Sequence, residues 1–494
     1  MVFLIFASFF FFVVVFLKFS PKSRNLPPGP WKLPLIGNLY NLAGDLPHRA
    51  LQRLSLKYGP LMHVRLGELS AVVVSSPDAA REVMRTHDVK FASRPRILVA
   101  EIMLYDCTSI TFSPPGDYWR HLRKICTSEL LSAKRVQSFR PLREQVFSDL
   151  ARWTASGEGS PVNLSEKILS STYEFTTRAA FGSKTDKKQR FLEILTEAFG
   201  YAAGFNIAEL FPSIGVVRTL SPARKRMMVL RRELDAILDE IIHQHEESDN
   251  DKEDLVDVLL KYRHDSDSGQ ELALTPDNIK AVILDVLGAG SETSATTIDW
   301  AMAEMLKNPI VLEKAQEEVR QVFDEQGGLI DESGIPELKY LKLIIKETLR
   351  LHAPVPLLLP RKCDEACELM GYEIPEDTKI IVNTWAINRD PKYWRDPESF
   401  KPERFLDSPI DYKGSNFEYT PFGSGRRICP GIVYGLANVE TPLAMLLYHF
   451  DWKLPDGLKP EEMDMAERAG ITASRAKDLV VVPVVKRPLP PVVK

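Results

Sequence analysis

Apolar residues recur every three to four positions along most of this chain, which is the spacing of an amphipathic or buried helix. The clearest helical segments are residues 230–243, 279–306, 311–323, 341–351 and 432–448. Strand signals are short: a hairpin at 61–76 that turns at Gly67-Glu68, a strand pair at 370–384 around Pro375-Glu376-Asp377, and a late strand at 479–485. The pattern predicts a mainly α fold with small β-sheets.

The N-terminus is more apolar than the rest of the chain. Every residue from 2 to 17 except Ser8 is apolar, and with Met1 this stretch would span roughly 25 Å as a helix, close to a thin bilayer. Basic residues follow it, which predicts a cytosolic body by the positive-inside rule. We therefore expect a transmembrane anchor at 1–19, a basic and proline-rich hinge at 20–30, and one folded domain at 31–494. A cleaved signal peptide is the alternative, but no basic segment precedes the apolar stretch and no A-x-A site follows it.

Charge and cysteine content exclude several classes of protein. The net charge of −4 over 494 residues gives no reason to expect nucleic acid as a partner, because such binding needs a clustered basic surface. Five cysteines are too few for a disulfide scaffold and fit a reducing compartment. Cys363 and Cys367 lack a neighbouring ligand to complete a zinc site, so we interpret them as ordinary thiols. The acidic stretches at 246–254 and 264–270 are expected to be solvated loops.

A glycine-rich loop, FGSGRRICPG at 422–431, carries the strongest chemical signal. Its glycines allow the backbone to approach a flat cofactor closely. Backbone N–H groups and the start of the following helix would stabilise a thiolate at Cys429. Arg427 would neutralise a carboxylate on the edge of the cofactor. The alternative is a structural cysteine beside a turn.

A second segment, AGSETS at 289–294, lies inside a long helical stretch. Glycine costs about 1 kcal/mol relative to alanine in a helix, and a threonine can bond back to the backbone, so we expect a local kink. Such a kink would open a groove in which Glu292 and Thr293 offer an acid and a hydroxyl for proton transfer. The alternative is an interior helix with a satisfied threonine. The GAG sequence at 288–290 follows a helix and lacks a third glycine, so a dinucleotide loop is rejected.

The sequence ETLR at 347–350 is an E-x-x-R pair, which normally means a surface salt bridge worth a few tenths of a kcal/mol. Glu82/Arg85 and Glu317/Arg320 have the same spacing, so the pattern alone is not informative. Only the copy at 347–350 is followed by a proline-rich HAPVP segment and, before the cysteine loop, by PERF at 402–405.

Together these segments resemble the cytochrome P-450 superfamily of haem-thiolate monooxygenases. The resemblance runs from the proline hinge to the final strand, and the motifs follow the family's order. It implies the P-450 fold, a haem-binding catalytic domain at 31–494, and haem b (iron protoporphyrin IX) with Cys429 as the metal ligand. It also implies catalytic roles for Thr293 and Glu292, and a structural cluster of Glu347, Arg350 and Arg404. The further cofactor contacts that it implies are Arg427, Trp119, Arg123, Arg361, Phe422 and Gly290.

The resemblance also implies partners. The chain shows no flavin or nicotinamide site, so electrons are expected from a separate NADPH-cytochrome reductase that docks near Arg120, Lys124 and Arg426. The other expected partners are O2, membrane lipid and a small-molecule substrate. The expected location is the endoplasmic reticulum membrane, with a single span and the catalytic domain facing the cytosol.

The segments that match the family's pocket walls are largely apolar, which predicts a lipophilic, neutral substrate. Their notable members are Phe205, Ile207, Val286, Ala289, Val355, Leu357 and Ile471. The resemblance is to the plant microsomal group and within it to terpenoid oxygenases, which implies oxidation of a terpenoid or other specialised metabolite. Two alternatives stay open: a haem-thiolate isomerase or dehydratase that does not use external O2, and a non-catalytic membrane-tethered binding protein.

Overall fold

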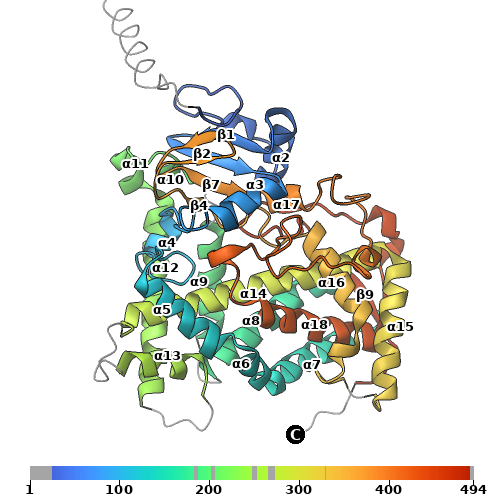
Figure 1. Ribbon diagram of the computed structural model, residues 1–494. Coiled ribbons are helices and arrows are strands. Elements are labelled where there is room, and N and C mark those ends of the chain that lie inside the picture. Colours follow the sequence, from blue (N-terminus) through green and yellow to red (C-terminus); the bar gives the residue numbers. More distant parts are fainter. Residues whose placement is uncertain are drawn as a thin grey trace, which may run out of the picture.

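The computed structural model describes residues 25–182, 187–201, 206–247, 253–264, 273–328 and 330–489. Four of the strands lie at one end of the molecule beside α2, α10 and α11, and long helices fill the remainder (Figure 1). The helices are α2 (Pro47–Tyr58), α3 (Pro77–Arg81), α4 (Leu98–Ile102), α5 (Asp117–Ile125), α6 (Ala133–Ser138), α7 (Arg140–Ser156), α8 (Leu164–Phe181), α9 (Lys188–Gly200), α10 (Ile207–Leu210), α11 (Gly215–Leu220), α12 (Pro222–Glu246), α13 (Leu255–His264), α14 (Pro276–Lys307), α15 (Pro309–Glu325), α16 (Lys339–Leu351), α17 (Thr384–Ile387) and α18 (Ile432–His449). The predicted mainly helical architecture is confirmed.

The predicted anchor at 1–19 lies outside the described residues. Within the part of the chain that the structure describes, no helix combines the length and apolar character that crossing a bilayer requires. Residues 25–30, at the end of the predicted hinge, are described, and they pack against the sheet. Pro28 accepts a hydrogen bond from the backbone N–H of His63 at 2.9 Å.

The strands of the described residues form three small sheets. The strand order in the first sheet is β1 (Leu61–Leu66), β2 (Leu69–Val74), β7 (Lys379–Val382) and β4 (Arg361–Lys362). The second sheet has the order β3 (Val162–Asn163), β9 (Val480–Val485) and β8 (Phe450–Lys453). The third is the pair β5 (Cys367–Leu369) and β6 (Tyr372–Ile374). The hairpin predicted around Gly67-Glu68 is confirmed, because β1 and β2 pair with Leu66 opposite Leu69. The late strand is confirmed as β9.

The strand pair predicted around Pro375-Glu376-Asp377 is wrong. β6 pairs with β5 instead, and the turn that joins these two strands is Met370-Gly371, where both residues have positive φ. β7 instead pairs in parallel with β2 and antiparallel with β4. Ile380 of β7 is fully buried, so its place in the middle of a sheet buries apolar surface that a two-stranded hairpin would leave in water.

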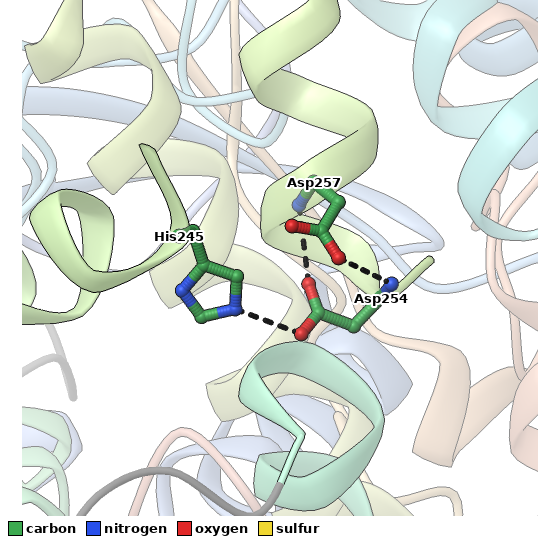
Figure 2. A group of neighbouring side chains, drawn as sticks. All are labelled: His245, Asp254 and Asp257. Atoms are coloured by element: carbon green, nitrogen blue, oxygen red, sulfur yellow. Dashed lines mark hydrogen bonds and ion pairs between the residues drawn. The ribbon is translucent and has the colours of Figure 1, made fainter. Parts of the chain in front are cut away.

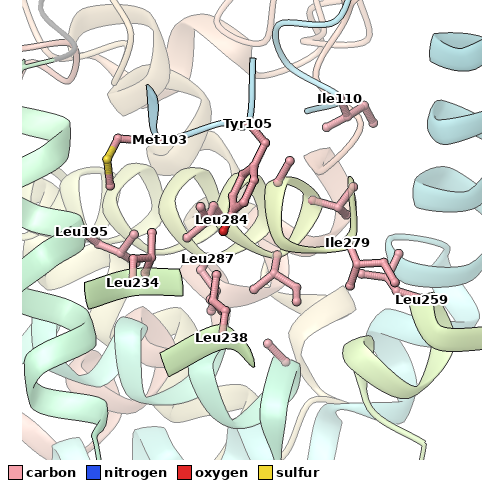
Figure 3. Close-up of a cluster of buried hydrophobic side chains, with 14 of the residues drawn as sticks. Met103, Tyr105, Ile110, Leu195, Leu234, Leu238, Leu259, Ile279, Leu284 and Leu287 are labelled. Carbon is pink, nitrogen blue, oxygen red and sulfur yellow. The ribbon is translucent and has the colours of Figure 1, made fainter. Parts of the chain in front are cut away.

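Helix α14 is the central element, and its predicted range is confirmed and extended. It begins with a capping box between Thr275 and Asn278, with Pro276 as its first residue. It packs against α8, α18 and α16 and is buried along most of its length. Figure 3 shows part of it within one of the large core clusters, whose labelled residues are Met103, Tyr105, Ile110, Leu195, Leu234, Leu238, Leu259, Ile279, Leu284 and Leu287. Because α14 is apolar on nearly every side, burial holds it in place.

Candidate active site

A cavity lies between α14 and the loop that precedes α18. Its walls come from four parts of the chain that are far apart in sequence, and most of the lining is apolar. The lining includes Arg94, Ile110, Thr111, Arg123, Cys126, Asp285, Val286, Ala289, Gly290, Thr293, Val355, Leu358, Arg361, Phe422, Gly423, Arg427, Cys429, Tyr434 and Gly435. The structure therefore brings together most of the residues that the sequence motifs singled out.

Cys429 lines the cavity from the loop that precedes α18. Burial raises the pKa of its thiol, while the backbone N–H of Gly431 and the charge of Arg123 act in the opposite direction. The loop is held in shape by the backbone N–H of Cys429, which donates to the carbonyl of Phe422 at 3.0 Å. A buried thiol with these thiolate-stabilising neighbours is suited to a metal ion, which would deprotonate it on binding.

Glycine is required in this loop for close packing as well as for the cavity. At Gly425, φ is +72°, and a Cβ atom would lie 2.0 Å from the carbonyl oxygen of Met84. At Gly423, φ is +70°, and this residue lines the cavity beside Leu358. The sequence predicted close approach to a cofactor for the loop glycines. The structure adds that the absence of a side chain at Gly425 lets the loop pack closely against the segment that follows α3.

Four guanidinium groups line the cavity, from Arg94, Arg123, Arg361 and Arg427. Burial lowers the pKa of Arg94 well below its ordinary value, and the charges of Arg361 and Arg427 lower it further. Among the described residues, Asp88 is the carboxylate that is ion-paired with this set, at 2.9 Å from Arg361. Buried positive charge in such excess is costly without an anionic partner.

These features fit haem b. Cys429 would ligate the iron, and the arginines would face the two propionates of the porphyrin edge. Arg94 was missed by sequence reasoning because the residues around it form none of the motifs recognised in the chain. Its guanidinium reaches the cavity while donating to the carbonyls of Leu359 and Pro360 at 2.6 and 2.9 Å.

Trp119 and Arg123 were predicted as a pair of cofactor contacts on one helix. Both lie on α5, but only Arg123 lines the cavity. The indole N–H of Trp119 donates to the carbonyl of Ile110 at 3.0 Å, and the guanidinium of Arg427 stacks 4.3 Å from its ring centre. Trp119 thus supports Arg427 in this structure, and its direct contact with a cofactor stays a prediction.

Gly290 and Thr293 are on the cavity wall that α14 provides. The hydroxyl of Thr293 donates to the carbonyl of Ala289 at 2.6 Å, as expected for a threonine that bonds back to the preceding turn. The kink expected here does not interrupt the helix, since α14 is continuous from Pro276 to Lys307. Burial against α8 and α18 outweighs the weak helix propensity of Gly288 and Gly290.

Glu292 faces a different direction from Thr293, because neighbouring residues on a helix are about 100° apart. Its carboxylate accepts a hydrogen bond from the hydroxyl of Thr472, and burial raises its pKa. It is not among the residues that line the cavity. Its role in catalysis stays a prediction.

The predicted substrate residues divide into three groups. Val286, Ala289 and Val355 line the cavity. Ile207, Leu357 and Ile471 do not line it: the first is 64% exposed on α10, and the other two pack at the edges of core clusters. Phe205 lies outside the described residues. The cavity also contains a polar group, Asp285, whose carboxylate accepts from the backbone N–H of Thr111 at 2.9 Å and whose pKa is raised by burial to about 6.

The structural cluster implied for the E-x-x-R pair is present. Glu347 and Arg350 have fully buried side chains joined by two hydrogen bonds of 2.8 and 2.9 Å, and Arg404 reaches the same carboxylate at 2.8 Å. The other two copies of the pattern form different contacts. Glu82 pairs with His87, whereas Arg320 pairs with Asp451.

A second cluster of ionisable groups, His245, Asp254 and Asp257, joins the end of α12 to the start of α13 (Figure 2). The imidazole of His245 faces the carbonyl of Ile241 at 2.7 Å and the carboxylate of Asp254 at 2.8 Å. Two acceptors require both ring nitrogens to carry protons. Asp254 also accepts from the backbone N–H groups of Val256 and Asp257. The prediction that 246–254 is a solvated loop is therefore wrong at Asp254, which is buried.

This cluster predicts a pH-dependent stability. Burial lowers the pKa of His245, but hydrogen bonds to Asp254 and Ile241 outweigh it, so the pKa is raised. A raised pKa stabilises the fold fully below the unfolded value of about 6.5, and the contribution is lost as pH rises through the folded value. We expect His245→Gln to destabilise the protein by about 1–3 kcal/mol near pH 6 and by progressively less at higher pH in urea unfolding. The exposed His243 supplies the control, and a pH-independent difference would contradict the assignment.

Comparison with known proteins agrees with this geometry. The family described as Cytochrome P450 matches residues 27–480. Salviol synthase from Salvia pomifera is 58% identical over 489 residues, covering 98% of this chain and 97% of that protein. Premnaspirodiene oxygenase from Hyoscyamus muticus is 49% identical over 486 residues, covering 97% and 96%. A solved structure of a zebra fish cytochrome P450 with abiraterone has a TM-score of 0.75 at 24% identity, covering 90% of this chain and 99% of that one. This likeness confirms the predicted mainly helical P450 fold, whereas the transmembrane helix that was part of the same prediction stays a prediction.

Proposed function

Because this chain belongs to the cytochrome P450 family, we propose that it hydroxylates or otherwise oxidises a plant terpenoid or related specialised metabolite, using electrons from NADPH-cytochrome reductase. As a member of the family it is a haem-thiolate monooxygenase that carries haem b and uses O2. The observation that carries the substrate class is the largely apolar cavity over Cys429, with Val286, Ala289 and Val355 on its wall. The name premnaspirodiene oxygenase, borne by a relative, supports the same class.

We assign different roles to different residues around the cavity. Thiolate-ligated haem, when bound, supplies the O2 activation that inserts one oxygen atom into a C–H bond or an alkene. Cys429 would hold the iron, and the arginines would hold the propionates. The apolar wall excludes water and orients a lipophilic substrate. Thr293 lines the same cavity as Cys429, and its hydroxyl would hold or pass a proton there.

Product analysis tests the proposal. The full-length protein would be combined with a plant NADPH-cytochrome reductase, NADPH, and separate panels of terpenes, phenolics and alkaloids. We expect new oxygenated products, with one atom of ¹⁸O from labelled O2, from the terpene panel. Oxidation confined to phenolics or alkaloids would overturn the substrate class, and products without the label would favour an isomerase or dehydratase.

Replacing Thr293 with alanine should uncouple the reaction. Haem content and substrate binding are expected to stay unchanged, because the hydroxyl bonds to its own helix and, among the described residues, to no other segment. Product formed per NADPH should fall by roughly tenfold or more, with the electrons recovered as hydrogen peroxide or water. Thr297→Ala is the matched control, since that hydroxyl bonds to the carbonyl of Thr293 at 2.8 Å and is not part of the cavity wall. An unchanged yield per NADPH would remove Thr293 from the mechanism.

We also propose a single-pass location in the endoplasmic reticulum membrane, with the catalytic domain facing the cytosol. The apolar run at 2–17 and the basic residues after it support this orientation. A second support is a patch of exposed apolar side chains on segments 31–36 and 207–220. Both segments are hydrogen-bonded to the turn at Gly67-Glu68, because the backbone N–H of Gly67 donates to the carbonyl of Ile36 and that of Glu68 donates to the carbonyl of Leu210. The patch consists of Trp31, Leu35, Ile36, Ile207, Ile214, Val216 and Leu220.

Deleting residues 1–19 is expected to weaken membrane association without removing it. The exposed patch should supply the remaining affinity, because apolar side chains partition into the bilayer interface. Adding Val216→Asp and Leu220→Asp to the deletion should release the protein in a vesicle flotation assay. Leu56→Asp, at an exposed leucine on α2 outside the patch, is the control. A deletion variant that floats equally well with and without the two aspartates would contradict the role of the patch.

A further inference from the structure

Two cysteines that do not line the cavity are in contact with each other. Cys363 directly follows β4 and Cys367 begins β5, and their sulfur atoms lie 3.9 Å apart. The sulfur of Cys363 also lies 4.0 Å from the carbonyl oxygen of Ile374, the residue that pairs with Cys367 in the hairpin of β5 and β6. From the sequence both cysteines were interpreted as ordinary thiols. At their observed separation, an approach of about 2 Å would bring the two sulfurs to the length of a disulfide bond.

The two sulfurs differ in their access to solvent. Cys363 is fully buried in a core cluster that includes residues of β2 and β7, whereas Cys367 is only partly buried. The three residues between them, 364–366, are exposed. A small oxidant dissolved in water can therefore reach Cys367, while Cys363 contacts Cys367 from the protein interior.

The charges around the pair favour a thiolate at Cys367 over one at Cys363. Burial raises the pKa of both thiols, and that of Cys363 to about 12. At Cys367 the thiol of Cys363 and the ammonium group of Lys90 oppose this rise, whereas the charge of Glu365 adds to it. An ion pair of 2.8 Å with Glu365 holds Lys90 in this place. Because the thiolate is the nucleophilic form of cysteine, Cys367 is the better attacking group of the two.

The backbone around Cys363 is held by its neighbours. Its N–H donates to the carbonyl of Thr378 at 2.9 Å. Arg361, two residues earlier, lines the cavity and donates to the carbonyl of Ser424 at 2.9 Å. Joining the two sulfurs would therefore move mainly the exposed residues 364–366 and the side chain of Cys367. The arginine in the cavity wall would keep its place.

We propose that Cys363 and Cys367 are a redox-active pair, which hydrogen peroxide converts to a disulfide and a small thiol such as glutathione converts back. Hydrogen peroxide is what O2 becomes when it takes up two electrons and two protons without oxygen insertion, so this oxidant arises at the protein itself. Transient disulfides with a redox-sensing role are the kind that occurs in reducing compartments. The proposal rests on neither the substrate nor the reductase proposed above.

The oxidation takes place in two steps. The thiolate of Cys367 attacks one oxygen of the peroxide and breaks the O–O bond, which gives a sulfenic acid and hydroxide. The sulfur of Cys363 then attacks the sulfur of Cys367, and its proton leaves with the displaced hydroxide as water. In sum, two thiols and one hydrogen peroxide give one disulfide and two molecules of water, with two electrons passing from sulfur to oxygen. In the return, two glutathione molecules become one glutathione disulfide.

Peptide mapping of the full-length, haem-loaded protein tests the pair without substrate, reductase or NADPH, so its failure is separate from that of the proposed function. Both cysteines fall on the tryptic peptide 363–379. After hydrogen peroxide and then alkylation of the unfolded chain, we expect this peptide to carry no alkyl group and to have lost two hydrogen atoms. Reduced glutathione should restore both alkylation sites. Alkylation of both cysteines after peroxide treatment would overturn the proposal.

Single replacements test which sulfur attacks the peroxide. In Cys363→Ser, Cys367 should become a sulfenic acid, which dimedone traps, and no disulfide should form. In Cys367→Ser, Cys363 should remain a thiol, because burial shields it from the oxidant and keeps it protonated. Cys107 is the control within each sample, since it is a buried thiol whose pKa burial raises to about 11, and it should stay fully alkylated. Dimedone trapping at Cys363 instead of Cys367 would overturn the proposed order of steps.

Replacing Lys90 separates the electrostatic effect from a merely structural one. Lys90→Gln should slow disulfide formation about three- to tenfold at neutral pH, because a neighbouring cation raises the fraction of thiolate. Lys90→Arg should keep the rate near that of the wild type. Lys57→Gln, at an exposed lysine on α2, is the matched control. The spectrum of the ferrous haem with carbon monoxide should be the same in all of these variants, and a wild-type rate in Lys90→Gln would overturn the assignment of Cys367 as the attacking thiolate.

Discussion

Cys429→Ala is expected to abolish monooxygenase activity and the strongly red-shifted Soret band that a thiolate-ligated ferrous haem shows with carbon monoxide. When bound to iron, the sulfur of Cys429 would donate electron density strongly enough to favour O–O cleavage. The arginines around the cavity remain in the variant, so part of the haem should still bind. The measurement is the CO difference spectrum together with haem content per polypeptide.

Cys126→Ala is the matched control for this experiment. Cys126 is a second thiol on the cavity wall, and burial raises its pKa to about 12, which keeps it protonated and a poor ligand. Its replacement should leave the spectrum unchanged. If the wild type lacks the band, or if Cys429→Ala keeps it, the thiolate assignment fails. A folded protein that never acquires haem would support the non-catalytic binding protein instead.

Glu347→Ala should have the largest effect on stability. The change leaves Arg350 fully buried without its carboxylate, and breaking a buried ion pair from one side costs about 3–5 kcal/mol. Domains are commonly stable by only about 5–15 kcal/mol. Arg404 and the backbone N–H of Lys401 lose the same acceptor. We expect a lower urea midpoint and a much smaller yield of folded, haem-loaded protein.

Glu82→Ala provides the comparison, because Glu82 and Arg85 have the same spacing as Glu347 and Arg350. The side chain of Glu82 is about one-third exposed, at 34%, and pairs with His87. Its loss should change the free energy of unfolding by no more than about 0.5 kcal/mol. Equal stability of Glu347→Ala and the wild type would show that the buried cluster does not hold the segment that leads to Cys429.

Local patterns accounted for much of the fold. The helices predicted at 279–306 and 432–448 and the hairpin predicted at 61–76 could be found because their signals, apolar spacing and a turn at Gly67-Glu68, lie within a few residues of one another. The pairing of β7 was not predictable in this way, since its partner β2 is some 300 residues away in sequence. Strand pairing depends on which apolar faces meet after the chain has folded.

In the candidate site, too, some features could be inferred from local motifs and others could not. The chemistry at Cys429 and the hydroxyl of Thr293 could be inferred because each lies in a motif whose residues act together. The hydrogen-bond partner of Glu292 could not be inferred, because that partner is Thr472, 180 residues away. Likewise Ile207 and Leu357 are apolar but do not reach the cavity, and Arg94 reaches it without any motif.

By itself the sequence determined the chemical identity of this protein: a cysteine in a glycine-rich loop, an E-x-x-R pair and a helix carrying a threonine, on a mainly helical chain. These are properties of residue types at short spacing, which covalent geometry keeps together. Only the tertiary structure decided which arginines surround the cavity and which apolar residues line it. The reason is physical: burial and charge compensation are properties of the packed chain, and they arise between residues that no sequence spacing relates.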